Sequence, residues 1–73
     1  MAFADMVRAA GLPEKPFYTP AEISRATGVS RSAIYEEIAA GRLAAFLPQG
    51  RTRKLIRPGW VDEWMERGTV RAV

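Results

Sequence analysis

The sequence predicts a small, mainly α-helical fold that also carries a β-hairpin. Two short helical segments with capping residues lie between Thr19 and Gly41, and two apolar stretches separated by a turn follow them. A last helical segment with regularly spaced apolar residues begins at Pro58. The chain has 73 residues, which allows one small domain.

The first central helix has a complete start signal. Thr19 can cap it, because its hydroxyl can accept an orphan backbone N–H, and Pro20 then stands at the first helical position. Glu22, three residues after the cap, completes a capping box. We therefore expect a helix from Pro20 to about Thr27.

A three-residue turn separates this helix from the second one. Gly28 tolerates the left-handed conformation that ends helices, Ser30 can cap the second helix, and Gly41 can close it. Two capped helices this short, joined by a tight turn that contains glycine, predict a helix-turn-helix.

The second helix should expose a short polar face. Ile34 and Ile38 are four residues apart and define its buried stripe. The opposite face is small to medium in side-chain size and fits a major groove without steric conflict. It consists of Ser32, Tyr35, Glu36 and Ala39, with Arg31 at its N-terminal flank.

A hairpin with a basic tip is expected next. Residues 42–47 and 54–57 are the predicted strands, and residues 48–53 supply the turn. A hairpin directly after a helix-turn-helix is a wing, so the predicted fold class is a winged helix-turn-helix. The segment 42–57 carries five basic residues and no acid, which favours a polyanionic partner. The five are Arg42, Arg51, Arg53, Lys54 and Arg57.

The ends of the chain flank this domain, which is predicted to span residues 18–68. In the N-terminal segment, residues 1–17, apolar positions at helical spacing (Phe3, Met6, Val7 and Ala10) predict a short amphipathic helix followed by a linker. This helix either docks on the domain's own core or contacts a neighbouring molecule. Trp60, Val61, Trp64 and Met65 share one face of the last helix and are expected in the core, and residues 69–73 are expected to form a loose tail.

Composition argues against catalysis. The chain has no cysteine and no histidine, so disulfides, thiolate metal sites and the commonest general base are all missing. No pair of carboxylates, nucleophile or phosphate-binding loop stands in a convincing constellation. We expect no enzyme activity, catalytic residue, metal, cofactor or small-molecule substrate. No apolar run is long enough to cross a bilayer, so no membrane partner is expected either.

Double-stranded DNA is the partner that this chemistry favours. Phosphate contacts provide affinity, and base-edge contacts provide sequence preference. Arg25 and Arg42 are candidate phosphate contacts, alongside backbone donors at the start of the second helix. The candidate recognition residues on that helix are Ser30, Arg31, Ser32, Tyr35 and Glu36.

Two of these residues offer specific base contacts. Arg31 can read guanine, and Glu36 can accept a hydrogen bond from the amino group of cytosine. Alternatively, the Glu36 carboxylate weakens non-specific binding by repelling phosphate, or it pairs with a neighbouring arginine.

The wing tip is small and cationic, and it is expected to enter a minor groove. Arg51 and Arg53 are the main candidates there, because a narrow minor groove has a strongly negative potential. Engagement of both grooves would bend the DNA. The candidate wing residues are Gln49, Gly50, Arg51, Thr52, Arg53 and Lys54.

Together these motifs resemble the excisionase family of small winged-helix proteins, also called recombination directionality factors, which is related to the MerR-type DNA-binding domain. The resemblance covers Tyr18 to Gly68 and includes Gly28-Val29-Ser30, Arg31-Ser32-x-x-Tyr35, Gly41-Arg42-Leu43, the basic Gly50–Lys54 tip and Arg57-Pro58 before a Trp-containing helix. It implies cooperative binding to repeated sites, DNA bending, and assistance to a phage integrase (a tyrosine or serine recombinase) in excision. It also implies major-groove contacts from Arg31, Ser32 and Tyr35. Self-association along DNA is expected because a single winged helix buries only a small interface and the amphipathic N-terminal stretch is a candidate contact. The chain departs from the family at Glu36, where a basic residue is common.

Two other functions remain open from the sequence. A small transcriptional regulator would use the same winged helix at a promoter. A protein-interaction module would use the Phe3/Met6/Val7 segment and bind DNA weakly. A phage excisionase would act in the cytoplasm of a bacterial host, associated with DNA.

Overall fold

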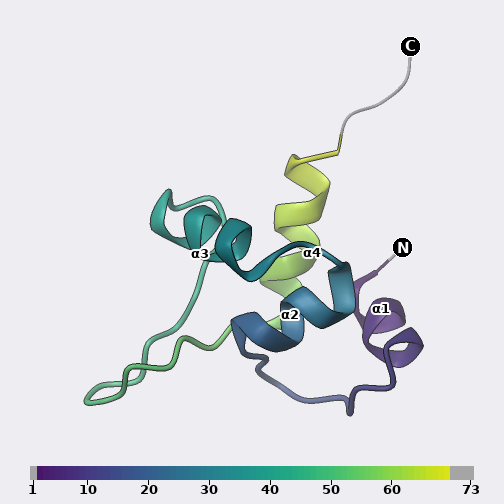
Figure 1. The fold of residues 1–73 in the computed structure, drawn as a ribbon, viewed down its shortest axis with the longest axis horizontal. Coiled ribbons are helices and arrows are strands. Elements are labelled where there is room, and N and C mark those ends of the chain that lie inside the picture. Colours follow the sequence, from purple (N-terminus) through teal and green to yellow (C-terminus); the bar gives the residue numbers. More distant parts are fainter. Residues whose placement is uncertain (1, 70–73) are drawn as a thin grey trace.

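Four helices pack around one apolar core in the computed structural model, which describes residues 2–69 (Figure 1). Helix α2 packs against α3, while α1 packs against both α2 and α4. The helices are α1 (Phe3–Ala9), α2 (Pro20–Thr27), α3 (Arg31–Ala39) and α4 (Pro58–Arg67).

The predicted start of α2 is confirmed in atomic detail. The Thr19 hydroxyl accepts a hydrogen bond from the Glu22 backbone N–H at 3.3 Å, and the Glu22 carboxylate accepts one from the Thr19 N–H at 3.0 Å. Gly28 ends the helix with φ of 80°, a left-handed conformation that costs a glycine little. The helix-turn-helix therefore begins and turns where the sequence predicts.

Helix α3 also follows its sequence signals. The Ser30 hydroxyl accepts a hydrogen bond from the Ala33 N–H at 3.2 Å. At the other end Gly41 is left-handed, with φ of 78°. Its N–H bonds to the carbonyl of Ile38, and the Arg42 N–H bonds to that of Glu37, both at 3.0 Å. This is the Schellman pattern, which satisfies the last carbonyls of the helix.

Every helix contributes to the core. Val61 is the fully buried residue of α4, whereas the tryptophans on either side of it, Trp60 and Trp64, pack against the core and remain partly exposed. The expectation that both tryptophans lie in the core therefore holds only in part. The buried side chains of the apolar core are Phe3, Val7, Tyr18, Ile23, Ile34, Leu43, Ile56 and Val61, and Pro20 is buried at the start of α2.

The amphipathic N-terminal helix docks on this core. Phe3 and Val7 are almost completely buried, and the Phe3 ring meets Tyr18 edge-on at 5.2 Å. The Phe3 N–H, at the start of α1, donates to the Asp62 carboxylate of α4 at 2.8 Å. The Phe3/Val7 face is therefore occupied within the chain, which removes it as the surface of a protein-interaction module or as a contact for self-association.

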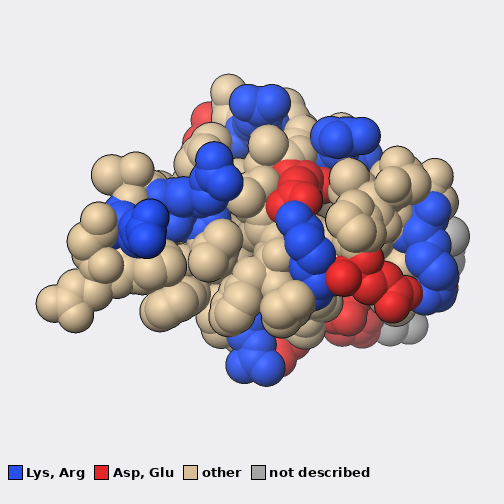
Figure 2. All heavy atoms as spheres, turned by 90° about the horizontal axis from the view of Figure 1, so that it is seen from below, with Lys and Arg blue, Asp and Glu red and all other residues tan. Residues whose placement is uncertain are grey.

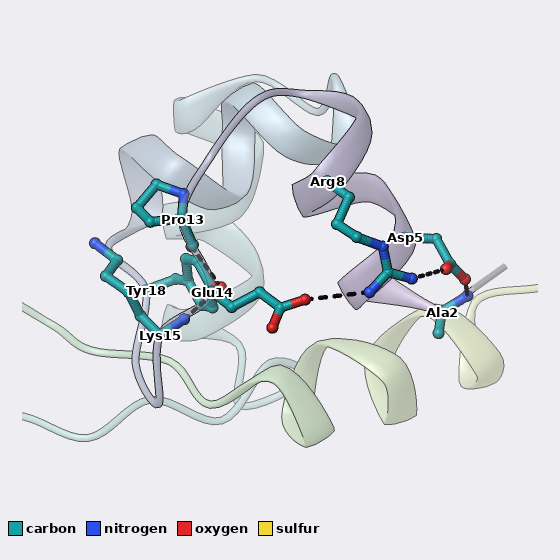
Figure 3. A network of polar contacts seen from close by, with 7 residues as sticks. All are labelled: Ala2, Asp5, Arg8, Pro13, Glu14, Lys15 and Tyr18. Carbon is teal, nitrogen blue, oxygen red and sulfur yellow. Dashed lines mark hydrogen bonds and ion pairs between the residues drawn. The ribbon is translucent and has the colours of Figure 1, made fainter.

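Polar contacts hold α1 and the following linker in place (Figure 3). Arg8 forms ion pairs with Asp5 and Glu14 on the surface. The Tyr18 hydroxyl donates to the carbonyl of Pro13 at 3.0 Å and accepts from the Lys15 N–H at 2.8 Å. The linker is thus tied to the residue that precedes the cap of α2.

The predicted β-hairpin is the main correction. Residues 45–55, here called the arm, extend away from the helices as two antiparallel limbs (Figure 1), but no regular strand forms among residues 2–69. The limbs share a single bridge, between Phe46 and Leu55, and a second bridge joins Ile56 to Tyr18. The first predicted strand fails because the N–H groups of Arg42 and Leu43 bond to the Glu37 carbonyl in the turn that ends α3.

The C-terminal end is described only to Thr69. The Thr69 hydroxyl donates to the carbonyl of Met65 at 2.8 Å, so this first residue of the predicted tail is hydrogen-bonded to the last turn of α4. The remainder of the predicted tail, residues 70–73, lies outside the described residues. Among the residues that are described, no helix is long and apolar enough to cross a membrane.

Candidate nucleic-acid interface

The outer face of α3 is exposed, as the spacing of its apolar residues predicts. Tyr35 is its largest member, with 48% of its surface exposed. Ser30 lies just before the helix and uses its hydroxyl oxygen as a cap acceptor, so its hydroxyl proton is the part free for another contact. The exposed positions are Ser30, Arg31, Ser32, Tyr35, Glu36 and Ala39.

The arm presents a concentration of positive charge. Basic side chains gather along it in Figure 2, at the left-hand end, whereas the acidic side chains visible in that view lie over the body of the molecule. Gly50 has φ of 76°, and the Arg51 N–H bonds to the Pro48 carbonyl at 3.0 Å, so the tip is a tight turn. Gln49, Gly50, Arg51, Thr52 and Arg53 are all exposed there.

An open cleft of about 500 Å³ lies where the arm, α3 and the start of α2 meet. Tyr35 and Lys54 line it together, and the Lys54 ammonium lies over the Tyr35 ring, 5.8 Å from the ring centroid. The fold thus brings the predicted recognition helix and the predicted wing into direct contact. The cleft is lined by Lys15, Thr19, Pro20, Ala21, Glu22, Tyr35, Thr52, Arg53 and Lys54.

Lys15 and Glu22 also line this cleft, although the sequence did not identify them as candidate binding residues. They form an ion pair that joins the linker before α2 to the helix itself. Burial alone would raise the pKa of Glu22, but hydrogen bonds from Lys15 and Thr19 outweigh it and lower the pKa below its usual value. The cleft is therefore not uniformly basic, and its excess of positive charge comes from the arm.

The candidate phosphate contacts Arg25 and Arg42 do not join this cleft. Arg25 is exposed near the C-terminal end of α2, beside a hollow that it lines with Met6 and Ala9 of α1. Arg42 donates from Nε to both carboxylate oxygens of Glu37, at 3.0 Å each. Arg25 and Arg42 therefore lie outside the cleft in which the recognition helix and the arm meet.

Glu37 is a central residue that the sequence reasoning missed. Its carboxylate accepts hydrogen bonds from Arg42 and from the Trp64 indole, which is 2.9 Å away, and these bonds lower its pKa to about 2. In turn Glu37 raises the pKa of Arg42. Glu37 and Arg42 are five residues apart, which is not a spacing that brings side chains together on a helix. They meet because the chain reverses at Gly41.

Glu36 stands next to this network but outside it. Glu36 takes no part in the ion pairs Arg8–Asp5, Arg8–Glu14, Lys15–Glu22 and Arg42–Glu37. Glu36 is exposed and acts on Arg42 only through its charge. Of the alternatives for Glu36, a direct pair with a neighbouring arginine is the one that this geometry disfavours.

A family model described as a helix-turn-helix domain matches residues 17–69, which is more than half of the chain. The chain belongs to this helix-turn-helix domain family. The family includes excisionase-like DNA-binding domains, is typically non-enzymatic, and implies DNA as the partner. No curated protein and no solved structure gives a significant match. For this helix-turn-helix domain, membership thus suggests DNA binding.

Proposed function

We propose that the chain is an architectural DNA-binding protein that acts as an excisionase. It binds repeated sites cooperatively, self-associates along DNA, bends it, and directs a phage integrase toward excision. The observation that carries the proposal is the cleft in which Tyr35 of α3 meets Lys54 of the arm. A recognition helix and a basic arm on one side of a small domain are suited to adjacent grooves of one duplex.

The two parts contribute different contacts. Arg31, Ser32 and Tyr35 on α3 contact base edges and adjacent phosphates in a major groove. Arg51 and Arg53 at the tip of the arm enter a minor groove, where their charge is attracted by the negative potential. Because α3 offers few base-reading side chains, recognition depends on DNA shape as well as on sequence. A single domain of this size buries a small interface, which favours several copies per site.

The test compares two double variants. Arg51→Ala/Arg53→Ala removes two charges from the arm, and Arg8→Ala/Arg67→Ala removes the same charge from α1 and α4. The arm variant should bind duplex DNA more weakly, and its plot of log affinity against log salt should be shallower by about two units if each arginine contacts one phosphate. The control should retain the slope of the unaltered protein.

DNA bending separates an architectural role from simple binding. The unaltered protein should bend a fragment that carries its sites, as measured by energy transfer between dyes at the fragment ends. The arm variant should bend it less at equal occupancy. Equal bending and an equal salt slope in the arm variant and the control would refute the role of the arm.

The excisionase role needs its own assay. Adding the protein to integrase and a substrate with both attachment-site halves should increase excision and reduce integration. A protein that binds and bends the DNA without affecting recombination would instead be a transcriptional regulator. Footprinting of the DNA next to the gene would supply the sites for this assay.

A further inference from the structure

The arm has few internal restraints. Near its base, Phe46 and Leu55 exchange backbone hydrogen bonds of 2.7 and 2.8 Å. Towards the tip, the bond from the Arg51 N–H to the Pro48 carbonyl is the one further backbone hydrogen bond within residues 45–55. A two-limbed ribbon of this kind is only marginally stable by itself in water.

Charge makes the arm still harder to hold in one position. Arg51, Arg53 and Lys54 lie within four residues of one another, and the segment 42–57 contains no acidic residue. Like charges this close repel one another, particularly at low ionic strength. The direction of the arm must therefore be set by contacts with the rest of the domain.

One such contact is apolar and lies at the base. The Phe46 ring is 5.9 Å from that of Phe17, centroid to centroid, so this pair holds the first limb beside the chain that leads into α2. It does not reach α3. The Lys54 ammonium, which lies over the Tyr35 ring, does join the arm to the outer face of α3.

We propose that Tyr35 is a positioning residue for the arm. Its ring attracts the Lys54 ammonium by a cation–π interaction and thereby sets the direction of the arm relative to α3. The spacing between the groove that α3 enters and the groove that the arm enters then depends on this pair. This inference deepens the proposed function and rests on it where DNA is concerned, but the positioning itself is a property of the free protein.

An aromatic ring suits this position better than a carboxylate would. A carboxylate would hold Lys54 more strongly, but it would also cancel its charge and repel the DNA phosphates. A tyrosine ring carries no net charge, so the arm keeps its full positive charge while it is held. Tyr35 is also about half exposed, and its free edge remains available for DNA.

The first experiment uses the free protein. In the nuclear magnetic resonance spectrum, the ring should shift the side-chain methylene signals of Lys54 upfield. Tyr35→Phe keeps the ring and should keep this shift, whereas Tyr35→Leu should abolish it and increase the fast motion of the backbone amides of residues 49–53. Equal shifts and equal amide motion in Tyr35→Leu and the unaltered protein would overturn the proposal. A thermal melt confirms that the variants remain folded.

The second experiment is a double-mutant cycle with Lys54→Met on duplex DNA. Tyr35→Leu and Lys54→Met should be coupled by about two- to fivefold in dissociation constant, the range for an exposed cation–π pair. Hydroxyl-radical protection in the minor groove should weaken in Tyr35→Leu and persist in Tyr35→Phe. Additive effects on affinity would overturn the coupling.

The two experiments fail in different ways. If the unaltered protein bound no DNA, the proposed function would fall, while the free-protein spectra would still decide whether Tyr35 positions the arm. If the protein bound DNA and Tyr35→Leu left the arm unchanged in both experiments, the positioning role alone would fall.

Discussion

Glu37 and Arg42 form a bidentate ion pair across the turn that ends α3, with Arg42 Nε 3.0 Å from each carboxylate oxygen. The same carboxylate accepts the Trp64 indole N–H, so the pair also joins α3 to α4. Arg67 of α4 adds a hydrogen bond to the Arg42 carbonyl at 2.8 Å. Arg42, a candidate phosphate contact in the sequence, therefore takes part in the contact between α3 and α4.

The first prediction concerns acid stability. Because its folded-state pKa of about 2 lies below its usual value of 4.5, Glu37 contributes stability that is complete above pH 4.5 and is lost as the pH falls towards 2. Glu37→Gln should lower the melting temperature at neutral pH, and its difference from the unaltered protein should shrink through that window. Circular dichroism melts at a series of pH values measure this.

Glu36→Gln is the matched control for that series. It removes the same charge one residue earlier, leaves the bonds to Arg42 and Trp64 intact, and should change the melting temperature little at any pH. A constant difference between Glu37→Gln and the unaltered protein across the window would contradict the prediction.

The second prediction separates Arg42 from Arg31. Arg42→Ala should lower the melting temperature, because it breaks the contact with Glu37, and should leave the salt dependence of DNA binding unchanged. Arg31→Ala, at the exposed start of α3, should reduce the salt slope by about one unit with little effect on melting. Anisotropy titrations between about 50 and 200 mM salt measure both slopes. A shallower slope for Arg42→Ala would show that Arg42 contacts a phosphate after all.

The third prediction addresses Glu36. An exposed carboxylate on a surface that approaches phosphates is repelled, so Glu36→Gln should tighten binding to random-sequence duplex by about two- to fivefold at low salt and by less at high salt. Glu63→Gln on α4 serves as the control and should have a smaller effect. If Glu36→Gln instead weakened binding to one particular sequence, the carboxylate would be reading a base.

The fourth prediction concerns the docking of α1. Phe3→Ala leaves a cavity beside Tyr18 and should cost about 3–5 kcal/mol of unfolding free energy. A domain of 73 residues has only about 4–11 kcal/mol in total, so the variant should lose a large share of its stability. Arg8→Ala on the exposed side of the same helix should cost less than about 1 kcal/mol. Urea unfolding followed by tryptophan fluorescence compares them, and equal small losses would mean that α1 does not dock.

The local features of the fold could be predicted from the sequence. The boundaries of α2, the capping box at Thr19, the left-handed glycine at position 28 and the exposed face of α3 all follow from residues within one or two helical turns. Capping and helical spacing are short-range effects, so the sequence contains their causes directly. Of the candidate site, the same reasoning predicted which side chains of α3 and of the arm are exposed.

The wing shows where such reasoning failed. A hairpin with strands at residues 42–47 and 54–57 was expected, but the backbone N–H groups of Arg42 and Leu43 bond to the Glu37 carbonyl, and the Leu43 side chain is buried in the core. Whether this segment forms a helix-ending turn or a strand depends on where the apolar side chain of Leu43 can be buried. That choice depends on residues far away in the chain.

The sequence by itself determined the helix-turn-helix, the basic segment after it and the absence of cysteine and histidine. Only the tertiary structure decided that Phe3 is buried in the core, that Arg42 and Trp64 both donate hydrogen bonds to Glu37, and that Lys54 lies over the Tyr35 ring. Helix caps and charge runs act over a few residues, whereas these contacts join segments that meet only after the chain has collapsed around its buried apolar side chains.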